Sequence, residues 1–358
     1  MVQIAIDAMG GDHAPRAVIE GAGEALARYP RISKLLLTGP QALIESELER
    51  IGLKGDERLE IVHTEQVIGM HESPAAAIRA KPRSSIAVAV ELVKDGRARG
   101  LVSAGHTGAA VASTVLKLRT LPGIERPGIA TVFPSPTGSF LLLDAGANVD
   151  GKPKHLAQYA VMGEIYAREI LRVPSPRIGL LNVGSEAGKG NEQAKQAYDI
   201  LSAMNGINFV GNIEGRDLFN DTVDVVVCDG FVGNVVLKCC ESMAKAFRDF
   251  LRNLLSKNPL RMTGALMCKG AFDEFRTLSD YAEYGGAPLL GVNGACIIGH
   301  GSSSPVAIRN AIRVAMEAVE HHLNEHIITR VRELGIASTA KSGNRAERDR
   351  QCGAAAAP

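Results

Sequence analysis

Six glycine-rich segments follow apolar runs in this sequence, and they contain most of the residues that could do chemistry. They are DAMGGD (7–12), SAGHTGA (103–109), DAGANVD (144–150), NVGSEAGKGN (182–191), CDGFVGN (228–234) and GHGSSS (299–304). Glycine lets the backbone approach a ligand closely. Free N–H groups at a helix start, together with the helix dipole, favour an anion such as phosphate. One such segment alone is more often a tight turn, but six together predict an anion site.

The common nucleotide and nucleophile motifs are not matched. GAGEAL at 21–26 lacks the third glycine of the dinucleotide fingerprint. The segment ending in Gly188-Lys189-Gly190 is one residue short of a P-loop and has no Ser or Thr after the lysine. There is no Gly-x-Ser-x-Gly elbow, and the cysteines lie in apolar surroundings. The sequence therefore disfavours both nucleoside triphosphate binding and a covalent acyl-enzyme.

Single residues in these segments have alternative interpretations. Lys189 could neutralise a phosphate or polarise a carbonyl group, or it could be an exposed loop lysine. Asn234 could donate to a developing oxyanion or cap a helix. We expect Asp7 and Asp12 to hold loop amides, because a carboxylate repels an anion. His13 could lie at the rim of the pocket.

A cluster of histidines near the C-terminal end is a weaker candidate. His321, His322 and His326 include an i, i+4 pair that could bind a metal ion. No carboxylate-rich motif accompanies them, so a solvated terminal helix is the favoured interpretation. We predict no metal site.

The composition is that of an ordinary globular protein. The 358 residues are 46% hydrophobic with a formal net charge of +1, which excludes a disordered chain or one that coats nucleic acid. The cysteines form no CxxC pair, so neither a disulfide framework nor a zinc site is predicted. No signal peptide and no membrane-spanning window are recognised. We expect a cytoplasmic protein.

The elements that must position these residues are apolar runs alternating with amphipathic stretches. The expected strands are VQIAID, KLLLTG, LEIVH, GLVSAG, GIATVF, SFLLLDAG, RIGLLNVG, INFVGNI, VDVVVCDG and, later, ACIIGHG. Continuous apolar runs indicate strands covered on both faces, hence a mostly parallel sheet. We therefore predict a doubly wound, three-layer α/β/α fold, in which the glycine-rich segments lie along one edge.

Two helical stretches, 233–256 and 258–279, are broken at Asn258-Pro259 and predict a helical hairpin inserted in the α/β body. Its basic and apolar tip suits a membrane surface, an acidic protein partner or a dimer interface with a basic rim. The tip residues are Arg252, Lys257, Leu260, Arg261 and Met262. A long helix is expected from about Ser304 to Leu334. Residues 1–334 would then form one domain, followed by a disordered tail at 335–358.

Several segments, taken in order, resemble the PlsX family of bacterial phosphate acyltransferases. They are IDAMGGDHAP, ESPAAAIRAKPRSSI, SAGHTGA, IERPGIA, LDAGANVD, CDGFVGNVVLK and YGGAPLLGVNG, and the similarity extends from residue 3 to about residue 330. The resemblance implies that phosphate attacks the thioester of a fatty acyl-acyl carrier protein, giving an acyl phosphate for phospholipid synthesis. It also implies a phosphate acetyltransferase-like body, a homodimer and peripheral association with the inner membrane. It leaves open a contact with the downstream glycerol-3-phosphate acyltransferase.

The resemblance carries a catalytic pair over to Lys189 and Asn234, with no cofactor and no covalent acyl-enzyme. One departure is His106, because the family segment reads SAGNTGA. We expect the affinity for phosphate to depend on pH between about 5.5 and 7.5 through this histidine. The hypothesis assigns phosphate and substrate binding to Asp7, Gly10, Gly11, Asp12, His13, Ser103, Gly105, His106, Thr107, Gly108, Asp144, Asn148, Gly233, His300 and Gly301.

Two other functions are alternatives to acyl transfer. A metal- and NAD-dependent decarboxylating dehydrogenase would share the α/β architecture, but the missing dinucleotide motif counts against it. A membrane-docking scaffold would use only the basic hairpin tip. Formation of acyl phosphate without lipid would distinguish the enzyme from the scaffold.

Overall fold

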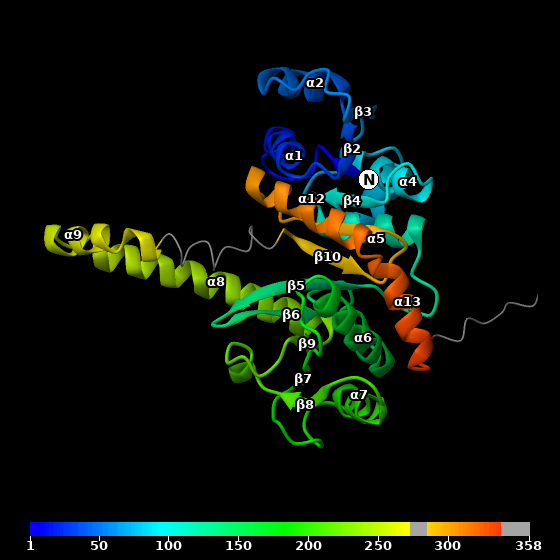
Figure 1. The fold of residues 1–358 in the computed structure, drawn as a ribbon, viewed down its shortest axis with the longest axis vertical. Helices are drawn as coiled ribbons and strands as arrows, with labels where there is room; N and C mark the ends of the chain where they lie inside the picture. The colour runs from blue at the N-terminus through cyan, green and yellow to red at the C-terminus, as the bar shows by residue number, and fades with distance from the viewer. Residues whose placement is uncertain (273–284, 338–358) are drawn as a thin grey trace, which may run out of the picture.

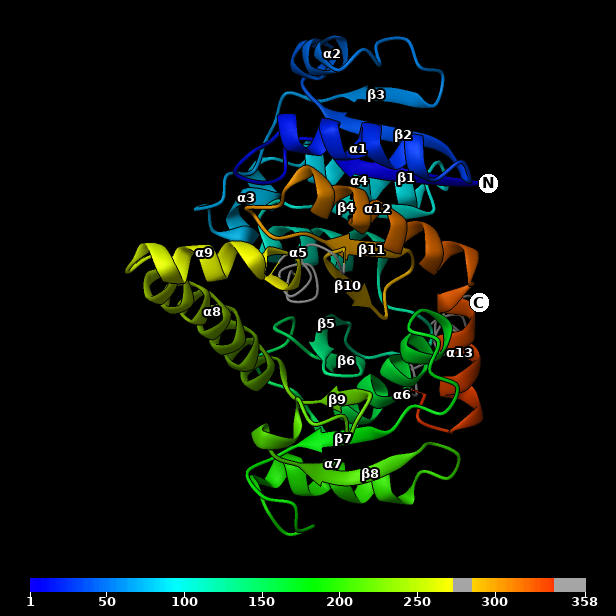
Figure 2. The same ribbon diagram turned by 60° about the vertical axis from the view of Figure 1, so that its left-hand side comes forward.

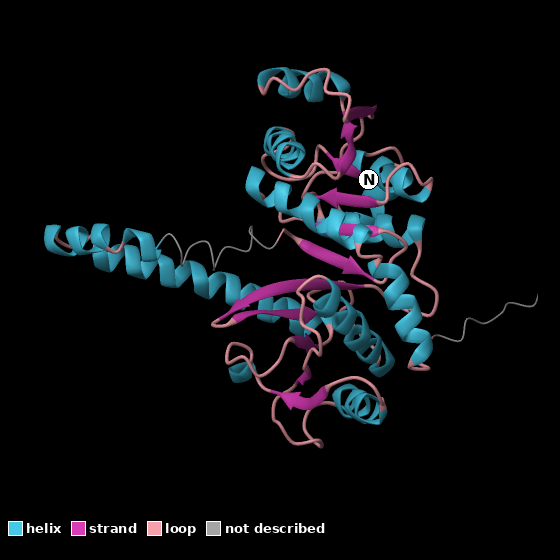
Figure 3. Cartoon of the chain, viewed as in Figure 1, coloured by secondary structure: helices cyan, strands magenta, loops and turns pink. Residues whose placement is uncertain are grey.

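The computed structural model describes residues 1–272 and 285–337. Within these residues, 11 strands form one sheet, and helices cover both of its faces (Figure 1). Figure 3 shows the strands as a central layer between the helices. The three-layer α/β/α fold predicted from the apolar runs is confirmed.

The first half of the sheet is entirely parallel. Its strands, in spatial order, are β3 (Leu59–His63), β2 (Ile32–Gly39), β1 (Val2–Asp7), β4 (Gly100–Ser103) and β11 (Ala295–Ile298). One face packs on α1 (Arg16–Arg28) and α12 (Pro305–Glu320). The other packs on α3 (Pro74–Ala80), α4 (Ser85–Lys94) and α5 (Thr107–Leu118). A further helix, α2 (Gln41–Arg50), precedes the edge strand β3.

The second half contains the parallel strands β6 (Gly138–Leu143), β9 (Val225–Val227), β7 (Ile178–Leu181) and β8 (Phe209–Ile213). One face is covered by α6 (Pro153–Glu169), α7 (Glu192–Ala203) and α13 (Leu323–Glu333). The other face contacts the start of α8 (Gly230–Leu255), and a short helix η1 (Gly215–Asp217) precedes β9. Each half thus has its own helices on both faces.

The two halves run in opposite directions, which the sequence did not predict. They are joined by β10 (Ala287–Leu290) and β5 (Gly128–Ser135), and the pairs β11/β10, β10/β5 and β5/β6 are all antiparallel. In register, Ile298 at the end of β11 is opposite Ala287, and Leu143 at the end of β6 is opposite Ala130. Because β10 is only four residues long, the carboxyl ends of both halves meet at this junction. The expectation of one common edge is corrected to two edges that meet.

The helical hairpin begins earlier than predicted. Helix α8 starts at Gly230, and α9 (Pro259–Met267) starts at the expected Asn258-Pro259 break, where the Asn258 side chain accepts from the Arg261 amide. The hairpin projects from the body, and Figure 2 shows α8 passing beside β5 and β6. Residues 273–279 of the predicted hairpin lie outside the described residues. Within the described residues, no helix is both long enough and apolar enough to span a membrane.

Two predictions near the C-terminal end are corrected. The expected helix over 304–334 is interrupted at His321-His322, where His322 adopts a left-handed conformation with φ of 48°, so α12 and α13 are separate helices. Residues 335–337, assigned to a disordered tail, are held by the body, because Lys154 Nζ donates to the Ala337 carbonyl at 3.3 Å. Residues 338–358 lie outside the described residues.

Candidate functional site

A cavity of 600 Å³ opens where the two halves of the sheet meet. Its walls are formed by α5, β5, the segment after β6, the start of α8 and the end of β11. The lining residues are Thr107, Gly108, Val111, Ala112, Ile129, Thr131, Ala145, Gly146, Ala147, Asn234, Leu237, Lys238, Glu241, Gly286, Ala287, Ile298, Gly299 and His300. Four of the six glycine-rich segments therefore reach one cavity.

The N-terminus of α5 supplies the most favourable wall for an anion. Thr107 and Gly108, the first two residues of this 12-residue helix, line the cavity, and His106 immediately precedes them. The first N–H groups of a helix have no partner within the helix, and they lie at its partially positive end. Gly299, which follows β11, is held against the neighbouring strand β4, since its amide donates to the Ser103 carbonyl at 2.8 Å. Two strand ends of the first half thus form one continuous wall.

The DAMGGD segment supports this wall from behind. Ser103 Oγ donates to Asp7 Oδ2 at 2.8 Å, and the Met9 amide donates to Asp7 Oδ1 at 3.3 Å. Burial raises the pKa of the Asp7 carboxyl group. A Cβ atom on residue 10 would lie 2.6 Å from the Gly105 nitrogen, so this position requires glycine. Asp7 thus has the loop-fixing role expected for it.

The remaining residues around this segment lie further out. The Asp12 amide donates to the Gly301 carbonyl at 2.7 Å, which joins the first and last glycine-rich segments. The side chains of Asp12 and His13 are exposed, and the cavity lining includes none of residues 7–13. Their predicted contact with substrate therefore stays a prediction.

The segment after β6 is organised by one buried carboxyl group. Asp144 accepts from the amides of Ile129, Gly146, Ala147 and Asn148 at 2.8–3.0 Å, and Asn148 Nδ2 donates to it at 3.1 Å. Burial raises the pKa of Asp144, whereas these donors oppose that shift. Asp144 and Asn148 were predicted to bind phosphate or substrate, but both carboxyl oxygens of Asp144 and the side-chain nitrogen of Asn148 are hydrogen-bonded within the protein. The neighbouring Gly146 and Ala147 line the cavity instead.

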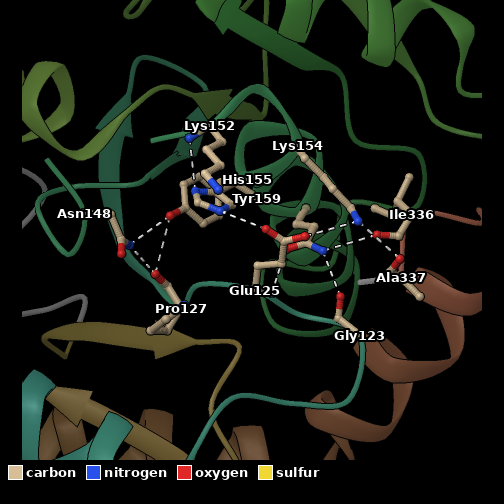
Figure 4. A network of polar contacts seen from close by, with 11 residues as sticks. Gly123, Glu125, Pro127, Asn148, Lys152, Lys154, His155, Tyr159, Ile336 and Ala337 are labelled. Carbon is tan, nitrogen blue, oxygen red and sulfur yellow. Dashed lines mark hydrogen bonds and ion pairs between the residues drawn. The ribbon is translucent and has the colours of Figure 1, made fainter. Parts of the chain in front are cut away.

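Behind this loop lies a network of polar contacts (Figure 4). Asn148 Nδ2 also donates to the Tyr159 hydroxyl group at 2.9 Å. Nearby, the Lys152 amide donates to His155 Nδ1 at 3.1 Å, which leaves Nε2 as the protonated nitrogen facing Glu125 at 3.2 Å. Burial lowers the pKa of His155, and the Glu125 carboxylate partly offsets this. The network holds the start of α6 against the loop.

Helix α8 enters the cavity with one face. The Asp229 side chain accepts from the Val232 amide at 2.9 Å and is the N-cap, so the alternative in which Asn234 caps the helix is wrong. A Cβ atom on residue 233 would overlap the Asp144 carbonyl oxygen, so Gly233 allows close packing here, and its contact with substrate stays a prediction. As a result Asn234 lies beside Gly146, where an added Cβ atom would be 3.4 Å from Asn234 Cγ.

Sequence reasoning missed the other cavity residues of α8. Leu237, Lys238 and Glu241 follow Asn234 at helical spacing and share its face. Lys238 Nζ lies 2.8 Å from Glu241 Oε2, and the lysine side chain is about half exposed. The i, i+4 relation of Lys238 to Asn234 is the signal that could have identified this cation. Lys238 is therefore a cationic candidate within the cavity.

Lys189 lies elsewhere. It is in the segment after β7, its Nζ is 3.7 Å from Glu186, and its side chain is 52% exposed. The segment is closed by its own contacts, because Asn182 Nδ2 donates to the Lys189 carbonyl at 3.0 Å. Lys189 is not among the cavity residues. The structure brings Asn234 to the cavity but not its predicted partner, whose role stays a prediction.

The hairpin tip combines exposed apolar and basic side chains. Leu260 is 83% exposed and Met262 is 57% exposed, and Arg252, Lys257 and Arg261 are exposed beside them.

The histidines of the C-terminal region have separate neighbours. Arg172 Nη2 lies 2.8 Å from His321 Nε2, and His326 Nδ1 lies 3.2 Å from Glu169 Oε1. In residues 1–272 and 285–337, no group of three metal-ligating side chains is found.

The chain is similar to known proteins over most of its length. A family model described as "Fatty acid synthesis protein" matches residues 2–326. A protein of Pelotomaculum thermopropionicum named phosphate acyltransferase is 51% identical over 335 residues, covering 94% of this chain and 96% of its own. Another of that name, from Halothermothrix orenii, is 49% identical over 323 residues, covering 90% and 96%.

Solved structures share the fold at low identity. A phosphotransacetylase from Streptococcus pyogenes matches with a TM-score of 0.60 and 19% identity, covering 89% of this chain and 94% of its own. A branched-chain phosphotransacylase from Enterococcus faecalis matches with a TM-score of 0.53 and 15% identity, covering 89% and 100%. These similarities confirm the architecture predicted from the sequence.

Proposed function

Because the chain belongs to the fatty acid synthesis protein family, we propose that it transfers a fatty acyl group from acyl carrier protein to inorganic phosphate. The enzyme is an acyltransferase, and its similar relatives are named for acyl transfer involving phosphate. The product is an acyl phosphate, which enters phospholipid synthesis, and the reaction is reversible. No metal and no cofactor take part.

The observation that supports this proposal most strongly is the cavity between the two halves. One wall is the N-terminus of α5 with Thr107 and Gly108, whose free amides and helix dipole suit a dianion. The opposite wall carries Asn234 and Lys238. Phosphate is largely ionised near neutrality, with a second pKa of about 6 in phosphoesters, so it needs no strong base to become a nucleophile.

The reaction is a direct displacement. A phosphate oxygen attacks the carbonyl carbon of the thioester, the carbon–sulfur bond breaks, and the carrier leaves as a thiolate with a pKa of about 8.5. Holding the two reactants in place supplies roughly 7–11 kcal/mol. One donor aimed at the oxyanion supplies about 3–4 kcal/mol. We assign that donor to Asn234 and keep Lys189 as a cation that approaches the same oxygen when substrate is bound.

Cysteine chemistry is not part of the proposal. Burial raises the pKa of the Cys228 thiol, and it raises that of Cys296 to about 11. A thiol with a raised pKa contributes little of the reactive thiolate near neutral pH. These residues are therefore unsuited to forming an acyl-enzyme.

The test uses purified protein without lipid. We expect free carrier thiol and acyl phosphate to appear in equal amounts only when both phosphate and an acyl-carrier thioester are present. Thiol release without phosphate would indicate a hydrolase and contradict the proposal. A reaction that required nicotinamide cofactor would favour the dehydrogenase alternative.

The hairpin supports a further part of the proposal, peripheral contact with the inner membrane and with the carrier. Its exposed tip residues are Arg252, Lys257, Leu260, Arg261 and Met262, and a face of the same hairpin would pair two copies as a homodimer. We expect sedimentation with anionic vesicles to be reduced in Leu260→Asp. Equal sedimentation of this variant and the wild type would remove the tip from membrane binding.

A further inference from the structure

A second cavity adjoins the first and differs from it in chemistry. Its volume is 580 Å³, and it lies between α8 and the hairpin of β5 and β6. Its lining is mainly apolar and includes Phe133, Phe219, Leu237, Met243 and Phe247. Thr131, Leu237, Glu241 and His300 line both cavities. The two spaces therefore adjoin each other at these four residues, which we call the neck.

We propose that this second cavity, the acyl chamber, holds the fatty chain of the substrate while its thioester lies at the neck. The inference rests on the proposed function. A substrate with a polar reacting end and an apolar tail needs a polar cavity beside an apolar one, and the two cavities share the residues of the neck. The chamber volume also lies within the roughly 300–1,000 Å³ of small-molecule sites.

The neck contains a buried hydroxyl group, that of Thr131. Thr131 Oγ1 is buried and has no hydrogen-bond partner in the part of the chain that the structure describes. A buried hydroxyl group without a partner is costly, and such groups are usually satisfied by water or ligand. In the proposal the Thr131 hydroxyl donates to the carbonyl oxygen of the bound thioester. This positions the carbonyl group between the chamber and the phosphate wall.

The far wall of the chamber is a packed aromatic cluster. The rings of Phe133 and Phe140 stack with centroids 5.3 Å apart, and Phe219 meets them edge-on at 6.4 and 5.5 Å. Such a cluster resists displacement, because each ring is held by two others. Phe219, which lies in the segment before β9, lines the chamber and is 44% exposed. In the proposal its ring limits how long a chain the chamber accepts. It is the residue we assign to chain-length specificity.

The first test narrows the chamber from the α8 side. Ala244 lines it, and Ala244→Trp should lower kcat/KM for a sixteen-carbon acyl-carrier thioester at least tenfold more than for an eight-carbon one. A misfit methylene in a hydrophobic pocket costs roughly 10- to 200-fold. Ser242→Trp is the matched control, because Ser242 is exposed on the opposite side of α8 and lines neither cavity.

The second test widens the chamber. It uses a smaller side chain, so its result does not depend on whether the larger side chain in Ala244→Trp disturbs folding. Phe219→Ala should shift the preference toward longer chains, and Thr131→Val should lower kcat/KM about equally for all lengths. Unchanged chain-length profiles in Ala244→Trp and Phe219→Ala would overturn the inference. A change in oligomeric mass with no change in profile would also overturn it and would assign the chamber to a second copy. If the wild-type protein made no acyl phosphate from any thioester, that result would contradict the proposed function itself.

Discussion

Two neighbouring strands, β9 and β7, are each followed by a glycine-rich segment, yet the two segments have different structures. After β9 the chain forms α8, which is capped by Asp229 and packed so closely on the Asp144 carbonyl that residue 233 must be glycine. After β7 the chain closes on itself through Asn182, and Lys189 remains about half exposed. Asn212 Nδ2 of β8 also holds this second segment, because it donates to the Glu186 carbonyl at 2.8 Å. Both segments are held by neighbouring strands, but of the two only the segment after β9 reaches the cavity.

The difference indicates what each candidate residue can do. Helix α8 places Asn234 at the cavity before substrate arrives, with its side chain exposed, and a donor already aimed at the reacting oxygen is what stabilises a transition state. Lys189 must approach the cavity, whereas Lys238 is already inside it. Glycine content alone does not distinguish a ligand-binding loop from a surface loop. The distinction is whether the segment lines a cavity, as the segment after β9 does.

The largest expected effect comes from Asn234, which already lines the cavity. Asn234→Ala should lower kcat by roughly 100- to 1,000-fold, as loss of one oxyanion donor does in other enzymes. Asn253→Ala, an exposed asparagine on the same helix, is the control and should remain near wild type. A loss below about threefold in Asn234→Ala, measured by acyl phosphate formation, would remove this residue from the mechanism.

The two lysines sharpen the comparison. We expect Lys189→Ala to lower kcat and Lys238→Ala to raise the KM for phosphate, each by roughly 10- to 100-fold, because a charge-assisted hydrogen bond contributes about 1.5–3 kcal/mol. Of the two lysines, Lys238 lines the cavity. Lys195→Ala on exposed α7 is the control. If Lys238→Ala lowered kcat and Lys189→Ala changed nothing, the oxyanion cation would be Lys238.

The loop that supports α8 should matter for stability. The Asp144 carboxyl group accepts hydrogen bonds from several backbone amides. Asp144→Asn replaces one of its acceptor oxygens with an NH₂ donor, which would face these amide donors. We expect the free energy of unfolding to fall by about 1–3 kcal/mol, with a loss of activity. Asp150→Asn, an exposed change in the same segment, should do neither. Denaturant unfolding of both variants measures this, and equal stability would contradict the account of the loop.

The smallest effect concerns the network behind the loop. Burial lowers the pKa of His155, so below the usual histidine pKa of about 6.5 the unfolded chain binds the proton more readily. Stability is then complete above that pH and is lost as pH falls toward the folded pKa, by at most about 1.4 kcal/mol per pH unit. His155→Gln should flatten this slope between pH 7.5 and 5.5. Parallel slopes for variant and wild type would refute the assignment.

The strands were predictable because buried apolar runs are a strong signal, but their directions were not. A run such as Gly128–Ser135 indicates burial on both faces and carries no sign of antiparallel pairing. β10 has four residues between glycines and was missed. The break at His322 has neither glycine nor proline to mark it.

The candidate site was predictable in part. The glycine-rich segments 103–109 and 228–234 were expected at a cavity, and Thr107 and Asn234 from these segments line it. Asp144 and Asn148 were expected there too, yet the Asp144 carboxyl group and the Asn148 side-chain nitrogen are hydrogen-bonded within the protein. A sequence does not reveal which carboxyl groups the fold buries. Lys238 and Thr131 were missed, since both lie within regular elements rather than in glycine-rich segments.

The most direct test of the central claim is a crystal structure with phosphate and a non-cleavable thioether analogue of the acyl-carrier substrate. We predict phosphate within hydrogen-bonding distance of the Thr107 and Gly108 amides and the analogue's reacting carbon beside Asn234. Phosphate bound elsewhere, with the junction of the two halves empty, would contradict the account.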